Sequence, residues 1–240
     1  WRYCFLNAPK SSQYIYFDGV KIIEHLIGKA EEANDSLLRE RYIDTLFMLY
    51  DQQIMVFGCQ PQYGEAFILG RKGRDMVQYR KQEDDAMYLT LKRSIDLDAI
   101  DAEAGTISVF YKVLEYMVKR GKADTTLIFD YYDILMTAMD TKIKEYNKLN
   151  IEAPADSAKN NARIKQLETA ENNINGLFDP WADCEQIIKI YTPKFDANKE
   201  DTEWLAKLVS LMDKKGCTED PLYFSAAEAR YTLDPSAEGA

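Results

Sequence analysis

Residues that commonly carry chemistry are few in this chain. It has one histidine, His25, and four cysteines. His25 lies in an apolar stretch between Ile22 and Ile27, and a lone histidine beside an apolar helical stripe is more often structural than catalytic. No two cysteines form a C-x-x-C pair, so zinc and redox motifs have little support. We therefore expect no catalytic residue, no metal ligand and no cofactor.

The stretch from Gly64 to Gly73 comes close to a phosphate-binding loop. Such a loop needs the pattern G-x-x-x-x-G-K-[ST] after a strand. Here Gly70 lies one residue too far from Gly64 and is followed by Arg-Lys-Gly, and no strand precedes it. We interpret Gly70 and Gly73 instead as small residues on a helix that allow a second helix to cross closely.

Acidic residues form two patterns with a chemical alternative. The spacing of Asp96, Asp98 and Asp101 hints at a calcium loop, but an EF-hand needs an oxygen ligand at its fifth position, where Ile100 stands. Glycosidase chemistry needs two carboxylates across a cleft, and the candidate pairs are Glu31 with Glu32, Asp84 with Asp85, and Asp18 with Asp44. Among 40 acidic residues, some pairs meet by chance, and nothing singles out one of these as catalytic.

Composition and charge narrow the classes of protein. The 240 residues are 46% hydrophobic and 29% charged, which are globular proportions. The net charge of −10 disfavours nucleic-acid binding, because acidic surfaces repel phosphates. No run of 18 or more apolar residues occurs, so we expect no transmembrane segment. The plainest interpretation of the acidic balance is a soluble helical surface, and any partner should present a basic or neutral face.

Apolar residues recur at helical spacing along the whole chain. The stripe through Ile43, Phe47 and Tyr50, with a second beside it through Leu46 and Leu49, predicts a helix contacted on two sides. Helices are predicted at roughly 1–6, 12–34, 42–57, Gly64–Lys81, Asp84–Leu97, Ala102–Arg120, Asp124–Leu149, Pro154–Phe178, Cys184–Asn198, Thr202–Lys215 and Pro221–Leu233. Short connections force consecutive helices to lie antiparallel.

A weak internal repeat favours a solenoid over a bundle. The segments that end at Asp98 and Asp234 look alike, and each is followed by an Ala-Glu pair, at 102–103 and 237–238. They are 136 residues apart, a multiple of the 34-residue period of tetratricopeptide repeats. We predict one all-α domain over residues 1–240, an α–α superhelix of about ten antiparallel helices with a concave groove.

The predicted helices bring two pairs of cysteines near each other. Cys184 opens one helix and Cys217 follows the end of the next, so an antiparallel hairpin makes them neighbours and predicts a disulfide. Cys4 and Cys59 should lie at one end of the first three helices, which gives a second and weaker disulfide candidate. The alternative is four free thiols in a cytosolic protein.

Several segments resemble a group of exported tetratricopeptide-repeat proteins of Bacteroidetes, and the resemblance covers nearly the whole chain. It rests on residues 1–9, Tyr16-Phe17-Asp18-Gly19, Tyr42-Ile43-Asp44-Thr45-Leu46, Tyr50-Asp51, Phe57-Gly58, Leu69-Gly70-Arg71-Lys72-Gly73, Tyr191-Thr192-Pro193-Lys194-Phe195 and Leu233-Asp234-Pro235-Ser236-Ala237. The resemblance implies a tetratricopeptide-like fold and an exported location, in the periplasm or cell envelope. The absence of an initial Met and the helix-like sequence at both ends predict a fragment of a longer chain.

The fold, more than any motif, guides the functional expectation. Helical solenoids hold proteins or peptides in their grooves, so we expect a non-enzymatic binding scaffold. The alternative is a carbohydrate-binding envelope protein that uses coplanar exposed aromatic rings. Aromatic residues cluster at Tyr14, Tyr16 and Phe17, at Phe110, Tyr111 and Tyr116, and at Phe129, Tyr131 and Tyr132. A hydrolase on a helical scaffold comes third.

Overall fold

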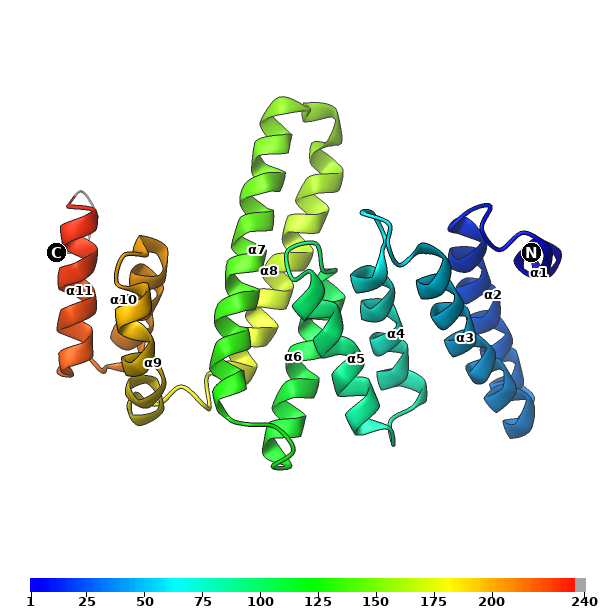
Figure 1. The fold of residues 1–240 in the computed structure, drawn as a ribbon, viewed down its shortest axis with the longest axis horizontal. Helices are drawn as coiled ribbons and strands as arrows, with labels where there is room; N and C mark the ends of the chain where they lie inside the picture. Colours follow the sequence, from blue (N-terminus) through cyan, green and yellow to red (C-terminus); the bar gives the residue numbers. More distant parts are fainter. Residues whose placement is uncertain (236–240) are drawn as a thin grey trace.

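The computed structural model describes residues 1–235, and this part of the chain is helical with no strand. Figure 1 shows the helices standing side by side in chain order, with the two termini at opposite ends of a long row. The elements are α1 (Arg2–Asn7), α2 (Tyr14–Glu32), α3 (Ser36–Phe57), α4 (Glu65–Tyr79), α5 (Asp84–Leu97), α6 (Ala104–Lys119), α7 (Thr126–Glu152), the 3-10 turn η1 (Pro154–Asp156), α8 (Ser157–Phe178), α9 (Cys184–Asn198), α10 (Thr202–Lys215) and α11 (Pro221–Leu233). The predicted fold class, an α–α superhelix, is confirmed.

Helix ends follow the capping residues of the sequence. The Asp201 carboxylate accepts hydrogen bonds from two backbone N–H groups of α10, and Gly216 ends that helix in the left-handed conformation with φ of 71°. The Asp124 carboxylate accepts from the Thr126 N–H at 2.8 Å, so α7 begins two residues later than predicted. Helix α8 begins at Ser157, because Pro154 opens a separate 3-10 turn.

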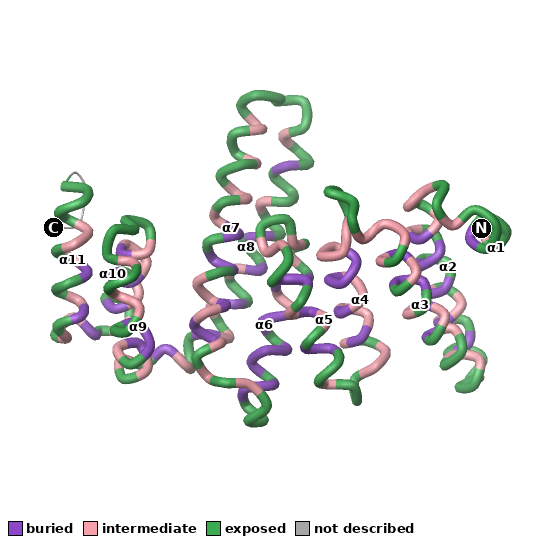
Figure 2. The backbone as a smooth tube through the Cα atoms, in the orientation of Figure 1, coloured by how far each residue is buried: buried purple, intermediate pink, exposed green. Residues whose placement is uncertain are grey.

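The helices pack chiefly with their sequence neighbours, and α8 returns beside α6 as well as α7. Helix α3 contacts both α2 and α4, as its double apolar stripe predicts. The buried side chains form two clusters, one over α1–α4 around Tyr16 and Leu46 and a larger one that extends from α4 to α11. Figure 2 marks where the buried residues lie along the helices. The α7–α8 hairpin projects well beyond its neighbours (Figure 1).

Two glycines set the distance between α4 and its neighbours. A methyl group on Gly70 would lie 2.8 Å from the Thr106 side chain of α6, and one on Gly73 would lie 2.5 Å from the Leu91 side chain of α5. Both glycines are buried. Their role in a close helix crossing is therefore confirmed.

The resemblance and the internal repeat both extend into residues 236–238, which lie outside the described part of the chain. None of the described helices has the length and apolar character needed to cross a bilayer.

Candidate binding groove

A hollow of about 1490 Å³ opens beside the projecting α7–α8 hairpin, and we call it the groove. Its first wall is the α3–α4 loop with the first turn of α4. Its second wall is the end of α5, the α5–α6 loop and the first turns of α6. Its third wall comes from the facing sides of α7 and α8. The α7–α8 hairpin, which supplies the third wall, extends past the ends of α4 and α6 (Figure 1).

Tyr63 is the main side chain of the first wall, and 43% of its surface is exposed. Its ring packs on Phe67 at 4.9 Å and edge-on against Phe17 at 5.7 Å, so the exposed ring has firm support. The loop that carries it is held by a 2.9 Å hydrogen bond from the Glu65 N–H to the Gly58 carbonyl. A side chain at Gly64 would come within 2.2 Å of the Gln60 carbonyl oxygen, so this tight loop needs glycine.

The second wall presents aliphatic surface. Leu97 is 50% exposed and Ile100 is 48% exposed. The loop between them and α6 turns at Asp98, whose carboxylate accepts a 3.0 Å hydrogen bond from the Asp101 N–H. This wall offers apolar contacts to a ligand from a loop fixed by its own hydrogen bonds.

The third wall is mixed. Tyr146 of α7 lies between two cations: the Lys142 nitrogen is 5.6 Å and the Arg163 guanidinium 5.4 Å from the centre of its ring. Beside them, α8 turns a ridge of small and polar residues to the groove, namely Ala162, Gln166, Ala170 and Asn173. Such a ridge lets a backbone approach closely and offers amide groups for hydrogen bonds.

Every acidic side chain of the groove already has a partner. Glu65 pairs with Arg93 at 2.7 Å, and Glu103 pairs with Arg74 at 2.7 Å. Asp101 pairs with Lys142, and Asp98 caps the loop as described above. The pKa of Lys142 is raised to about 12, because hydrogen bonds to Asp101 and Glu145 outweigh the effect of burial.

Two cations of the groove have no such partner. Arg163 and Lys165 of α8 are exposed and make no ion pair within residues 1–235. Arg163 has only its contact with the Tyr146 ring. Against these two cations stands one carboxylate without an ion pair, Asp98, so the charge that the groove leaves open is positive on balance, although the chain as a whole carries −10.

A second hollow of about 530 Å³ lies between α3, α4 and α5. Its charged groups are already engaged with each other. Lys72 pairs with Asp51 at 2.5 Å, and Arg80 pairs with Asp44 at 2.5 Å and with Glu83 at 3.5 Å. Because this hollow leaves no charge open and is smaller, the groove is the stronger candidate for binding.

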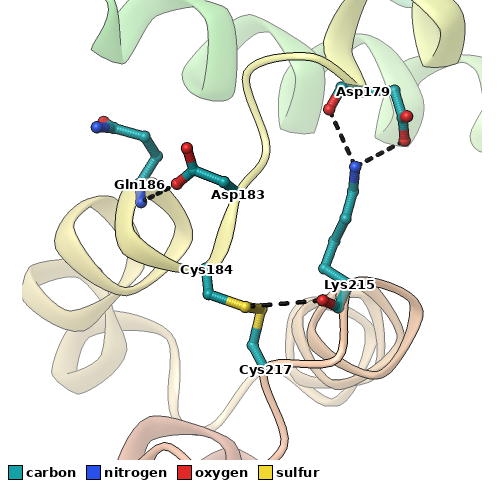
Figure 3. Close-up of a disulfide and its surroundings, with 6 residues drawn as sticks. All are labelled: Asp179, Asp183, Cys184, Gln186, Lys215 and Cys217. Carbon is teal, nitrogen blue, oxygen red and sulfur yellow. Dashed lines mark hydrogen bonds and ion pairs between the residues drawn. A yellow bond between two sulfur atoms is a disulfide. The ribbon is translucent and has the colours of Figure 1, made fainter.

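The structure joins Cys184 and Cys217 in a disulfide, with their Cα atoms 5.5 Å apart (Figure 3). It links the start of α9 to the segment after α10, as the hairpin argument predicts. Next to it, Lys215 bonds the Asp179 carboxylate at 2.7 Å and the Asp179 carbonyl at 3.0 Å. The disulfide closes the α9–α10 unit, and the contacts of Lys215 with Asp179 fasten this unit to the end of α8.

The candidate pairing of Cys4 with Cys59 was wrong: both are free, exposed thiols. In α1 the neighbouring residue Phe5 turns into the core and stacks on Trp1, which leaves Cys4 on the outer side of a six-residue helix. Helix α1 contacts α2 and makes no comparable contact with α3, whose end carries Cys59. The sequence pattern did not reveal that α1 lies on the far side of α2.

The other candidate residues make no site of their own. His25 is exposed on α2, and no group of three or more metal-ligating side chains occurs among the described residues. Asp96 bonds Lys92 at 2.5 Å and the Tyr131 hydroxyl at 2.5 Å, so it is not free for a cation. Gly70 and Gly73 lie inside a helix and cradle no loop.

Each candidate carboxylate pair has at least one member held by a cation, and Asp18 and Asp44 pair separately with Lys21 at 3.9 Å and with Arg80 at 2.5 Å. Lys122 bonds Asp85 at 2.8 Å and lies 3.8 Å from Asp84. Glu31 pairs with Arg39 at 2.8 Å. None of the pairs lies in the groove.

Asp133 and Asp75, two half-buried carboxylates, have raised pKa values. Burial raises the pKa of Asp133 from 3.8 to about 6, although hydrogen bonding by Tyr191 and the charge of Lys194 lower it. Burial likewise raises the pKa of Asp75, which accepts a 2.6 Å hydrogen bond from Tyr50. Neither carboxylate lines the groove or the second hollow. Each accepts a hydrogen bond from a tyrosine of another helix and so contributes to helix packing.

The aromatic clusters divide between core and surface. Among the residues that the sequence grouped, Tyr14 is 71% exposed and Tyr116 is 39% exposed, whereas Tyr16, Phe110, Tyr111, Phe129 and Tyr131 are buried. Sequence reasoning missed Tyr63 and Tyr146. The one signal for Tyr63 was its place in a loop bounded by Gly58 and Gly64, where an aromatic side chain has no helix face to fill.

Comparison of the chain with protein-family models, with curated proteins and with solved structures gives no match in any of the three. The groove itself is therefore the basis for assigning a function.

Proposed function

We propose that this protein is a non-enzymatic scaffold that binds a segment of a protein or peptide in the groove. The observation that carries the proposal is the groove's size together with its exposed anchors. Its volume of about 1490 Å³ exceeds the roughly 300–1,000 Å³ of ordinary small-molecule pockets. Tyr63, Leu97 and Ile100 give it apolar contacts on two walls, and exposed tyrosines are favoured anchors at protein interfaces.

The alternative, carbohydrate binding on an aromatic platform, has less support. A platform needs exposed rings that lie nearly parallel. The contacting ring pairs that include an exposed tyrosine or Phe224 are inclined at 59° to 88°: Tyr63 with Phe67, Tyr63 with Phe17, Tyr14 with Phe17, and Tyr223 with Phe224. Edge-on rings offer a sugar no continuous flat surface.

We also propose that the protein works in an oxidising compartment, such as the periplasm or cell envelope. The Cys184–Cys217 disulfide supports this location, because structural disulfides persist mainly outside the reducing cytosol. An exported tetratricopeptide-like scaffold agrees with the resemblance seen in the sequence. The acidic balance of the chain argues against a nucleic acid as the partner.

Selection from a displayed library of random twelve-residue peptides tests the proposed function. Peptides enriched on the protein are measured by calorimetry against the double variant Tyr63→Ser, Ile100→Ser. Loss of the two anchors should weaken binding about tenfold or more. The matched control is Tyr231→Ser, Leu37→Ser, which removes similarly exposed side chains outside the groove, 54% and 65% exposed.

The outcomes separate the two functions. Binding that falls in the groove variant and persists in the control supports the scaffold. Equal binding to all three proteins places the ligand elsewhere and contradicts the groove. No enriched peptide, together with retention on a glycan array, rejects the scaffold in favour of carbohydrate binding.

A further inference from the structure

We infer that the segment bound in the groove is acidic, with carboxylates that pair with Arg163 and Lys165 while apolar side chains lie against Tyr63 and Ile100. The inference rests on the proposed function and names the chemistry of the partner. Its basis is the charge that the groove leaves unpaired.

The four acids of the groove are engaged by Arg93, by Arg74, by Lys142 and by a backbone N–H group. At Glu65, Glu103 and Asp101 a basic ligand would have to displace the cation already bound, and only Asp98, held by a backbone N–H group, has no cation to displace. The two cations left over, by contrast, need no rearrangement before they accept a carboxylate. Hydrogen bonds between charged groups are among the stronger polar contacts, and arginine presents a planar pair of donors to a carboxylate.

The positions of the two cations point to more than one acidic residue in the ligand. Arg163 and Lys165 are two residues apart on α8, so their side chains leave on opposite flanks of the helix. Between the flanks lies the small-residue ridge of Ala162, Gln166 and Ala170. A segment that crosses this ridge passes one cation on each side, which suits separated Asp or Glu residues better than a single carboxylate.

The N-termini of two helices add to the positive charge of the groove. Helices α4 and α6 both begin in the groove, and neither has a side chain that caps its first N–H groups. The N-terminus of a helix carries partial positive charge; α6 has no acidic residue in its first turn, whereas Glu65 offsets this charge at the start of α4. This contribution is secondary to the two cations, and it has the same sign.

The net charge of −10 favours a basic or neutral partner at long range. The distance between charges decides whether this long-range effect or the direct pairing with Arg163 and Lys165 dominates. At physiological ionic strength, charges separated by more than about 8 Å are largely screened, whereas direct pairs within the groove are screened much less. Local chemistry therefore selects an acidic segment, and salt should weaken its binding.

The test selects peptides from the same random twelve-residue library on three proteins, which are wild type, a groove variant and a control variant. The peptides selected on each protein are then sequenced. Wild type should enrich Asp and Glu over Asn and Gln by roughly threefold to tenfold, as expected for one or two partly exposed ion pairs. The variant Arg163→Gln, Lys165→Gln should lose this acid preference and still select apolar anchors that depend on Tyr63. Both side chains are exposed, and thermal melting checks that the variant folds.

The matched control is Arg41→Gln, Lys159→Gln, which removes one arginine and one lysine, both exposed and outside the groove. Acid preference that survives in the control and vanishes in the groove variant supports the inference. Equal loss in both variants indicates a long-range charge effect and overturns it. Selection of Tyr63-dependent peptides without acid preference overturns the acidic ligand but leaves the proposed function standing. Failure to select any peptide overturns both.

Discussion

Tyr191 of α9 donates a 2.7 Å hydrogen bond to the Asp133 carboxylate of α7. Lys194 of the same helix forms an ion pair with Asp130 at 2.6 Å, and Lys207 of α10 forms one with Asp140 at 3.0 Å. These polar contacts, together with the ring contact between Phe129 and Tyr191, join α9 and α10 to α7. The contact between α7 and α9 therefore contains a half-buried carboxylate whose pKa is raised to about 6.

Stability should depend on the protonation of Asp133. Its folded pKa, about 6, lies above its ordinary value of 3.8, mainly because of burial. The folded protein therefore binds this proton more tightly than the unfolded chain. The resulting stabilisation is complete below about pH 4 and is lost as the pH rises through 6.

The variant Asp133→Asn stays neutral and can still accept the Tyr191 hydrogen bond. Its free energy of unfolding should decline less than that of wild type between pH 4 and pH 7. Urea unfolding across this range measures the difference, with Asp196→Asn, an 89% exposed carboxylate of α9, as the control. Parallel curves for wild type and Asp133→Asn would show that Asp133 does not titrate in this window.

The disulfide should supply a large part of the stability at the C-terminal end. Cys184 and Cys217 are 33 residues apart, and closing a loop of this length is worth about 3–4 kcal/mol in the chain-entropy model. The variant Cys184→Ser, Cys217→Ser should lose that amount in urea unfolding. The variant Cys4→Ser, Cys59→Ser, which alters two exposed thiols, should match wild type. A similar loss in both variants would contradict this assignment.

Glycine substitutions should have opposite effects at two positions of the fold. Gly70→Ala places a methyl group 2.8 Å from Thr106 and should cost about 1–3 kcal/mol. Gly28→Ala meets nothing within 4 Å on α2 and should stabilise the protein by about 0.5–1 kcal/mol. Chemical denaturation measures both. A neutral Gly70→Ala would mean that α4 and α6 can move apart freely.

Apolar spacing was sufficient to predict the fold. The predicted helix Thr202–Lys215 has the bounds of α10, and the double stripe through Ile43 and Leu46 gave α3 its two neighbours. This signal is local, because a stripe acts within a few turns of its own helix. For the same reason the Cys184–Cys217 pairing, within one hairpin, could be predicted.

The groove could not be predicted in this way. Tyr63 lies in a loop, where no periodicity indicates which way a side chain turns. Tyr146 reads as an ordinary core residue of a long helix, and its exposure depends on how far the α7–α8 hairpin projects past α4 and α6. The predicted pairing of Cys4 with Cys59 was wrong for a related reason. The side of α2 on which α1 packs is decided by tertiary contacts, which no local sequence pattern indicates.

Hydrogen exchange with bound peptide tests the central claim, a groove that binds an extended segment, most directly. The probe is the tightest peptide recovered from the random twelve-residue library, added at saturation to the wild-type protein. Slower exchange confined to residues 58–67, 97–108 and 142–173, with α10 and α11 unchanged, is the predicted result. Protection at the ends of the row, or around the second hollow between α3 and α5, would contradict the account.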